Sequence, residues 1–575
     1  MVVTVGLEPT VSLRSVSFAI VALLRCCLHR SFAQPASASL HPALRALGSA
    51  PHDVNDVLSP CSMLAAKTQD LVVLDHENLS NSTRVGWLDR QGQTVINHNQ
   101  SRKTQNKNDE ITKIKMTKNI KQMLRKTQNN RIMTSDGGGK VKYIERIIDR
   151  QIDQRIKAFN AISIVGPKGC GKTRTAKERC RTTIEFQDEE RRDGYIAVAE
   201  TSPTLFFSNP KPILFDEWQD APKIWGAIRK DCDDHPEAIG EYYLTGSTSQ
   251  KVKTPHTGTG RISELLMYPM TLWETGESDG SISLSVLFDH PEAQFGGNVS
   301  PITLKDLFFA VCRGGWPRCL AIKDKTAKLE IAKDYYRQIW QKDISTVDDV
   351  KRNPEWARML LWSFARNMAA RTKKTSIYAD VQATQNVTDV TLASYITALE
   401  QLFVIKDLDA WMPQIRSKTA IRASKKHLFV DPSIGLAALG IDPSYFNNDL
   451  DFFGHVFENL VIRDLLVYAQ VHDATVLHYS DDSGLEADAV YQLPDGRYAL
   501  IEIKTGMNEI PAAEQGLLKF VDMIREYNKK ALADPRHPRA IYREPTLLIT
   551  ICANAPMSYK TEKGVFVIPV GCLRD

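Results

Sequence analysis

The chain has 575 residues, of which 43% are hydrophobic, 25% charged and 8% aromatic. This is the composition of an ordinary globular protein, and the length allows roughly three or four domains. The formal net charge of +5 is too small to indicate nucleic-acid binding by itself. No apolar run is long enough to cross a bilayer, so we expect no membrane partner. The ten cysteines are scattered without metal-binding spacing, which favours a reducing compartment, and we expect a cytoplasmic protein.

Residues 1–133 differ from the rest of the chain. Short apolar pieces without pattern are followed by a tract rich in Asn, Gln, Lys and Arg from Asn97 to Arg131. We expect this region to be disordered, or to be an extension wrongly added upstream of a start at Met116 or Met133. The alternative is a basic arm that holds DNA or RNA.

A phosphate-binding loop follows the first strong pattern of the chain. Apolar residues from Tyr143 to Ile156 recur at helical spacing, and the apolar run 161–165 then predicts a strand. The next eight residues fit the pattern G-x-x-x-x-G-K-T, and they are Gly166, Pro167, Lys168, Gly169, Cys170, Gly171, Lys172 and Thr173. The sequence therefore predicts a nucleoside triphosphate as the first ligand.

The residue types of this motif predict how each part of the loop would contact the ligand. Backbone N–H groups would surround the β-phosphate, Lys172 would reach the β- and γ-phosphates, and the Thr173 hydroxyl would ligate Mg²⁺. Because Lys172 stands in a surface loop by sequence, we expect its removal to leave the fold intact. A glycine-rich turn without a ligand is the alternative interpretation.

The run 212–219 predicts a buried strand that ends in two carboxylates. Asp216 at the strand tip would hold Mg²⁺ through water, and Glu217 would polarise the attacking water. The alternative is an acidic strand end that only caps the next helix. Asp216 and Thr173 are thus the expected metal-binding residues, and Glu217 is an expected catalytic residue.

A third strand, 241–247, and a glycine-containing loop complete the expected nucleotide domain, which we place at residues 134–297. Thr245 or Ser247 would contact the γ-phosphate. Arg261 stands where an arginine finger would reach the nucleotide of a neighbouring subunit, which makes it a second expected catalytic residue and predicts a homo-oligomer. A solvated loop arginine is the alternative.

Residues 298–445 predict a helical lid followed by a winged-helix region. The pattern from Asp306 to Ala370 is largely helical, and a further helix, 391–403, precedes two strand-like pieces. The loop between these strands is basic, and a hairpin of this kind contacts phosphate backbones, so DNA is a candidate partner. A loop kept soluble by its charge is the alternative. The basic residues are Arg416, Lys418, Arg422, Lys425 and Lys426.

The C-terminal region, 446–575, carries a second group of charged residues. In the predicted hairpin, Asp488 on one strand faces Glu502 and Lys504 on the next, and Glu458 lies on the preceding helix. An acid followed by acid-x-lysine resembles the restriction-endonuclease-like fold, in which two carboxylates bind Mg²⁺ and the lysine positions a water. A solvated strand face is the alternative, and the fold does not by itself establish nuclease activity.

The ordered motifs resemble prokaryotic predicted ATPases of the AAA+ superfamily that end in a domain of unknown function, number 4143. The matching pieces lie between Tyr143 and Lys519, and they include Tyr143–Asp149, Gly166–Thr173, Asp216–Gln219, Leu244–Ser247, Gly258–Ile262, Gly314–Pro317, Phe457–Asn459, Glu486–Asp488 and Glu502–Lys504. The resemblance implies an α/β protein with a P-loop AAA+ type parallel sheet, a helical lid and winged-helix linker, and a C-terminal restriction-endonuclease-like domain. It also implies ATP and Mg²⁺ as cofactors.

We therefore expect an ATPase that uses nucleotide state to control a nuclease-like module acting on nucleic acid. Two alternatives remain open: a nucleotide-dependent switch whose C-terminal fold is catalytically inactive, and a DNA-binding regulator whose winged helix makes the contact.

Overall fold

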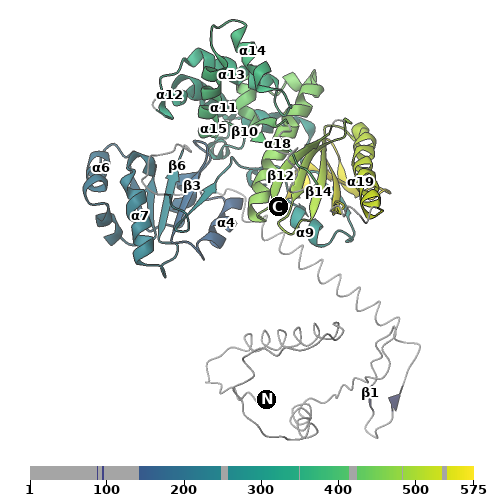
Figure 1. Cartoon of the computed structure of the whole chain (residues 1–575), viewed down its shortest axis with the longest axis horizontal. Helices are drawn as coiled ribbons and strands as arrows, with labels where there is room; N and C mark the ends of the chain where they lie inside the picture. The colour runs from purple at the N-terminus through teal and green to yellow at the C-terminus, as the bar shows by residue number, and fades with distance from the viewer. Residues whose placement is uncertain are drawn as a thin grey trace. The chain divides into compact units, whose positions relative to one another are not determined.

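The computed structural model describes residues 87–88, 94–95, 142–247, 257–348, 350–413, 424–481, 483–533 and 541–575. The chain divides into two units, Met1–Met116 and Thr117–Asp575. In the first unit, β1 (Trp87–Leu88) pairs antiparallel with β2 (Thr94–Val95). The predictions for the rest of residues 1–133 lie outside the described residues. The remaining elements, several of which are labelled in Figure 1, belong to the second unit.

A five-stranded parallel sheet forms the nucleotide region, in the order β4-β5-β6-β3-β7. The middle strands are fully buried, which explains why their sequences are continuous apolar runs and do not alternate. The strands are β3 (Ala161–Val165), β4 (Thr182–Glu185), β5 (Ile213–Asp216), β6 (Tyr242–Gly246) and β7 (Ile262–Leu266). The helices are α4 (Ile147–Arg155), α5 (Lys172–Lys177), α6 (Arg192–Thr201), η3 (Pro203–Ser208), η4 (Trp218–Asp220), α7 (Lys223–Asp234) and α8 (Leu272–Thr275). The sheet confirms the predicted P-loop type of α/β fold.

The middle region is helical and contains a short hairpin. Strand β10 (Ile405–Leu408) pairs antiparallel with β11 (Lys426–Phe429), directly after two helices. The winged-helix interpretation of this order stays a prediction, and Arg416, Lys418 and Arg422 lie outside the described residues. The helices are α10 (Leu304–Arg313), η5 (Pro317–Ala321), α11 (Lys325–Gln338), η6 (Ile339–Asp343), α12 (Ile344–Thr346), α13 (Pro354–Arg366), α14 (Lys374–Gln382), α15 (Asp389–Gln401), α17 (Pro432–Leu439) and η7 (Tyr445–Asn447).

The C-terminal region contains a seven-stranded mixed sheet in the order β12-β13-β14-β15-β17-β16-β9. The long helices α18 (Leu450–Val471) and α19 (Ile510–Leu532) contact it. The strands are β12 (Thr475–Ser480), β13 (Glu486–Gln492), β14 (Tyr498–Lys504), β15 (Leu547–Cys552), β16 (Met557–Lys560), β17 (Phe566–Pro569) and β18 (Leu573–Arg574), with η8 (Met507–Glu509) and η9 (Val570–Cys572) between them.

Two strands from the end of the expected nucleotide domain pair with C-terminal strands. Strand β8 (Ile282–Ser283), which precedes α9 (Leu284–Asp289), runs parallel to β18. Strand β9 (Gly296–Val299) runs antiparallel to β16. Residues 282–299 therefore share sheets with the C-terminal region, although our expected boundary at 297 places nearly all of them with the nucleotide-binding residues.

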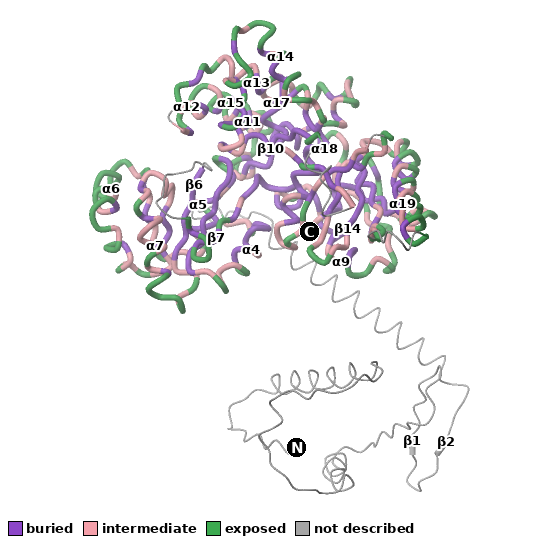
Figure 2. Tube along the Cα trace, viewed as in Figure 1, coloured by how far each residue is buried: buried purple, intermediate pink, exposed green. Residues whose placement is uncertain are grey.

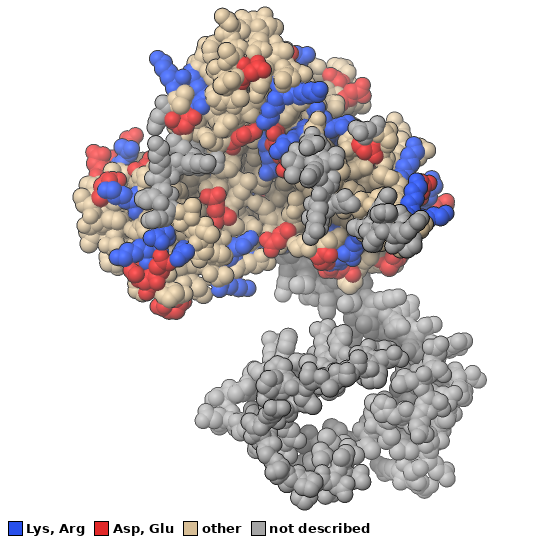
Figure 3. Space-filling view, in the orientation of Figure 1, with Lys and Arg blue, Asp and Glu red and all other residues tan. Residues whose placement is uncertain are grey.

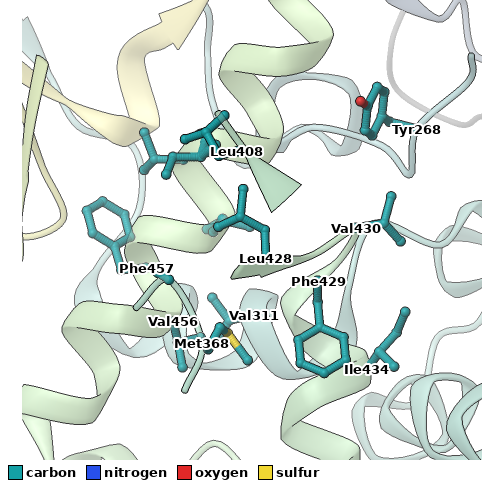
Figure 4. Close-up of a cluster of buried hydrophobic side chains, with 14 of the residues drawn as sticks. Tyr268, Val311, Met368, Leu408, Leu428, Phe429, Val430, Ile434, Val456 and Phe457 are labelled. Carbon is teal, nitrogen blue, oxygen red and sulfur yellow. The ribbon is translucent and has the colours of Figure 1, made fainter. Parts of the chain in front are cut away.

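The largest hydrophobic core cluster joins the middle and C-terminal regions. Helix α18 buries more than half of its residues, and Figure 2 shows buried segments running through this part of the chain. Figure 4 shows the contact between β11 and α18, where Leu428 and Phe429 lie beside Val456 and Phe457. The seven cysteines among the described residues are free, and no helix in the same ranges is long and apolar enough to cross a membrane.

Candidate nucleotide site and carboxylate cluster

The phosphate-binding loop runs from the end of β3 to the start of α5. Gly166 has φ +148°, and a Cβ atom there would lie 2.2 Å from the Met267 carbonyl oxygen, so the loop requires glycine at this point. Gly171 precedes α5 with φ +112°. The loop thus brings backbone N–H groups to a helix N-terminus, an arrangement suited to binding a phosphate.

The Lys172 side chain is buried, which corrects our expectation of a surface lysine. Its ammonium group donates hydrogen bonds to the carbonyl oxygens of Gly166, at 2.9 Å, and Pro167, at 3.0 Å. The Lys172 side chain is therefore tied to the backbone of its own loop. The sequence did not predict this contact, because it forms only when the loop folds so that the Gly166 and Pro167 carbonyls lie next to the Lys172 side chain.

Asp216 ends β5 within reach of two hydroxyl groups. Thr173 donates to its Oδ1 at 2.7 Å, and Thr245 on β6 donates to the same oxygen. Burial raises the pKa of Asp216, while these two hydrogen bonds oppose that shift. The predicted grouping of Thr173, Asp216 and Thr245 is present in the structure, and their proposed roles toward Mg²⁺ and phosphate stay predictions.

Glu217 follows with φ 52°, an uncommon conformation for a residue other than glycine. Both of its carboxylate oxygens accept hydrogen bonds: Ser247 Oγ donates to Oε1 at 2.6 Å, and Gln219 Nε2 donates to Oε2 at 2.5 Å. The Ser247 backbone N–H also points to Oε2, at 3.2 Å. Two donors thus reach Oε2 and one reaches Oε1, so the carboxylate is held in place, and its proposed role toward water stays a prediction.

Arg261 lies immediately before β7 and is partly exposed. Its Nε donates to Asp233 Oδ1 at 2.7 Å, and its Nη1 donates to the Thr259 carbonyl at 3.1 Å. This pairing holds the side chain along the surface of the nucleotide region. The arginine-finger role stays a prediction, and it requires the ion pair to open.

Arg146 ties the phosphate loop to the rest of the nucleotide region. It is buried and donates to the carbonyls of Cys170, at 2.7 Å, and Tyr268, at 2.9 Å, and to Glu274 Oε1 at 2.9 Å. The same Glu274 oxygen accepts the Ile147 N–H at 2.7 Å. Although burial opposes it, this pairing and the backbone donors hold the pKa of Glu274 below its usual value.

A pocket of about 370 Å³ lies beside this arginine and the loop. Its walls combine Tyr143 and Arg174 with Pro317 and Leu320 from the middle region. The Tyr143 hydroxyl is fixed by Asp149 Oδ2 at 2.8 Å and Thr175 Oγ1 at 2.9 Å. Of the lining residues only Gly171 was predicted as a site residue, because the pocket forms only when segments more than 140 positions apart come together.

Lys168 in the loop also contacts the middle region. Its Nζ lies 2.7 Å from Asp343 Oδ1, at the end of η6, a segment of π-helix. Such segments often occur at functional sites. The phosphate loop and the helical middle region are therefore joined by an ion pair that an incoming phosphate would compete for.

The C-terminal charged residues come together as the sequence predicts. Lys504 Nζ lies 2.6 Å from Glu502 Oε2 and 3.2 Å from Asp488 Oδ2. Asp488 Oδ2 also accepts the Ile503 N–H at 2.8 Å. These side chains line one side of a pocket of about 610 Å³, which Gln515 and Lys519 of α19 also line.

A second lysine enters this cluster from the middle region. Lys426 on β11 contacts Glu458 Oε1, and its Nζ lies 3.6 Å from Asp488 Oδ1. The side chain is only 8% exposed. The sequence places Lys426 both in the basic loop and at the start of the next strand; in the structure it is the first residue of β11, and its buried side chain points into the carboxylates and not to solvent.

The ionisation of the cluster reflects its burial. Burial raises the pKa of Glu458 to about 8 and that of Glu502 to about 7, and the neighbouring Asp488 carboxylate acts in the same direction. Burial would also raise the pKa of Asp488, but Lys426 and Lys504 together hold it below its usual value. Asp488 is therefore the carboxylate that most strongly retains its charge.

We tested whether either site fits a divalent metal. Among the described residues, no three His, Cys, Asp or Glu side chains are grouped so that they could hold a metal ion. The nucleotide site does not need such a group, because a hydroxyl, one carboxylate and the phosphates suffice for Mg²⁺. In the C-terminal cluster the oxygens facing one another already contact lysine ammonium groups, so the residues as arranged do not fit a divalent ion.

Comparison with known proteins adds three family matches. Residues 158–276 match the family described as "AAA domain", residues 304–445 match "Domain of unknown function (DUF8612)", and residues 453–573 match "Domain of unknown function (DUF4143)". No curated protein matches the chain.

Solved structures with distant similarity include a Walker-type ATPase of Pyrococcus abyssi, at 12% identity and a TM-score of 0.32, covering 52% of this chain and 96% of the other. A RuvB variant of Thermotoga maritima is 15% identical with a TM-score of 0.20, covering 45% of this chain and 88% of the other.

Proposed function

The chain combines an AAA domain with a C-terminal domain of the DUF4143 family, and on this basis we propose that it binds and hydrolyses ATP and that nucleotide state controls the C-terminal module. The observation that carries the proposal is the edge of the parallel sheet. There the phosphate loop follows β3, and Asp216 and Glu217 lie at the end of β5. Strand β6 lies between β3 and β5, and Thr245 and Ser247 at its end donate to the two carboxylates.

Each group of residues in the nucleotide site would have a separate role. Backbone N–H groups of the loop bind the phosphates, and Lys172 exchanges its two carbonyl partners for phosphate oxygens. Thr173 and Asp216 would hold Mg²⁺, which supplies charge neutralisation for the phosphates when it is bound. The pocket beside Tyr143 would take the base, since its apolar walls exclude water from a flat ring.

Glu217 would act on the attacking water. Ser247 and Gln219 orient its carboxylate, which has about four acceptor positions and so can also receive a hydrogen bond from the water. Arg261 of a neighbouring copy would complete the site in a homo-oligomer, once its bond to Asp233 opens.

The experiment is ATP turnover and ATP binding by the full chain with Mg²⁺. We expect Lys172→Ala to lose ATP binding and Glu217→Gln to bind ATP without turnover. Lys177→Ala is the matched control, because Lys177 lies on the same helix and pairs only with Glu185 on the surface. Normal turnover in Glu217→Gln would show that the base is assigned wrongly, and ATP binding by Lys172→Ala would refute the site itself.

A second candidate function is supported by the lysines in the C-terminal cluster. Because ammonium groups occupy the carboxylates, we propose as the alternative a nucleotide-dependent switch whose nuclease-like domain is inactive. On the face shown in Figure 3, basic and acidic side chains of the described residues are interspersed, so charge does not single out a nucleic-acid surface there. Assaying DNA and RNA cleavage with Mg²⁺ or Mn²⁺, beside Lys504→Ala, separates the two candidates: cleavage lost in the variant supports a nuclease.

A further inference from the structure

Lys426 belongs to the middle region of the chain but completes a group of charges in the C-terminal region. The cluster contains three carboxylates, Glu458, Asp488 and Glu502, and two ammonium groups, Lys426 and Lys504. Lys504 bridges Asp488 to Glu502 on one side. Lys426 bridges Glu458 to Asp488 on the other side, so both oxygens of Asp488 have a cationic partner.

The position of Lys426 is fixed by the packing of its strand. Three residues further along β11, the Phe429 N–H donates to Asn459 Oδ1, and Asn459 Nδ2 donates to the Phe429 carbonyl, both at 2.8 Å. Asn459 follows Glu458 on α18, and Leu428 and Phe429 are buried against that helix in Figure 4. The strand therefore holds the ammonium group against Glu458 through a packed, hydrogen-bonded contact.

We propose that Lys426 is a permanent internal cation that takes the place of a divalent metal between Glu458 and Asp488, so that the native C-terminal site binds no divalent ion. A buried charge needs a partner of opposite sign, and the lysine supplies it within the chain. A divalent ion entering this site would have to displace the ammonium group or lie beside it, and like charges repel strongly at such distances. The two carboxylates between which a divalent ion would bind are thus already paired with the Lys426 ammonium group.

The inference predicts that neutralising one lysine creates a metal site. Lys426→Met keeps an unbranched side chain of similar length, so it preserves packing against α18 while removing the charge. Glu458 and Asp488 would then lack a cation between them, and Mn²⁺ would restore it. Because the repulsion and the competition for the same oxygens both disappear, we expect Mn²⁺ affinity to rise at least about a hundredfold over wild type.

The experiment is titration of the nucleotide-free full chain with Mn²⁺, followed by electron paramagnetic resonance of the free ion. All proteins carry Thr173→Ala, which removes a ligand of the nucleotide-site metal. Lys425→Met is the matched control: it is the adjacent lysine, 51% exposed, and pairs with Asp409 away from the cluster. Lys426→Arg keeps the positive charge, so it should also bind no Mn²⁺. Adding Asp488→Asn to Lys426→Met should abolish the gained binding.

Two results would overturn the inference, and circular dichroism first establishes that each variant is folded. One is a folded Lys426→Met protein that binds Mn²⁺ no better than wild type. The other is Mn²⁺ binding by the chain with Lys426 intact that disappears on Asp488→Asn, which needs no change at Lys426 and decides the matter even where Lys426→Met does not fold. Neither result depends on ATP hydrolysis, so failure here leaves the ATPase proposal to its own test.

Discussion

Replacing Arg146 by methionine should destabilise the nucleotide region severely. The guanidinium group makes three buried hydrogen bonds, to Cys170, Tyr268 and Glu274, and the variant leaves the Glu274 carboxylate buried without its cation. Removing one partner of a buried ion pair costs about 3–5 kcal/mol. With a urea dependence of about 2–3 kcal/mol per molar, the unfolding midpoint should fall by about 1–2 M.

The assay is urea unfolding of the full chain, followed by circular dichroism, with hydrogen exchange of peptides covering residues 146–152 and 268–276 to locate the effect. Arg155→Met is the control, because Arg155 lies on the same helix and makes only an exposed pair with Asp473, which should be worth less than about 1 kcal/mol. Adding Glu274→Leu to Arg146→Met should recover part of the loss, since the double variant buries no unpaired charge. A cost below about 1 kcal/mol for Arg146→Met would refute the reasoning.

Three further predictions concern the nucleotide site and His478 on strand β12. Tyr143→Ala should weaken ATP binding about tenfold by removing a pocket wall, whereas Tyr143→Phe should not, as measured by calorimetry. Asp343→Asn frees Lys168 for phosphate and should tighten ATP binding by up to about fivefold; weaker binding would contradict this. Burial lowers the pKa of His478 to about 4, and its Nε2–H donates to the Ser424 carbonyl. At His478 the unfolded chain therefore binds more protons between pH 6.5 and 4, so the contribution of this residue to stability should fall by about 3 kcal/mol as pH drops through this range, and this part of the fall should be absent in His478→Gln.

The sequence predicts the parts of the site that are local in the chain. The phosphate loop and the strand ending at Asp216 follow from spacing and apolar runs of five to eight residues. Arg146 and Glu274 were not predicted as a pair, because they are 128 positions apart and neither has a local pattern of its own. Their contact exists only after the helix α4 has packed beside the loop.

The environment of Lys426 likewise could not be predicted from its neighbours in the sequence. By its charge Lys426 was counted with the basic loop, although the expected strand begins at the same residue. Lys425, before the strand, is half exposed and pairs with Asp409, whereas Lys426, the first residue of β11, is buried and contacts Glu458. The carboxylates that it contacts lie 32 and 62 positions further on, in α18 and β13, and no local pattern links these elements to β11.

The shared core around α18 has a practical consequence for dividing this chain. The matched families end and begin at residues 445 and 453, which invites a cut between them. Such a cut would leave Leu428, Phe429 and Val430 on one fragment and Val456 and Phe457 on the other, each exposing the apolar face that it now covers. Fragments of that kind aggregate when made alone. When the two pieces are made together in one cell, they retain complementary surfaces and should be recovered as a complex. The boundary between the two matched families therefore lies within one continuous hydrophobic core.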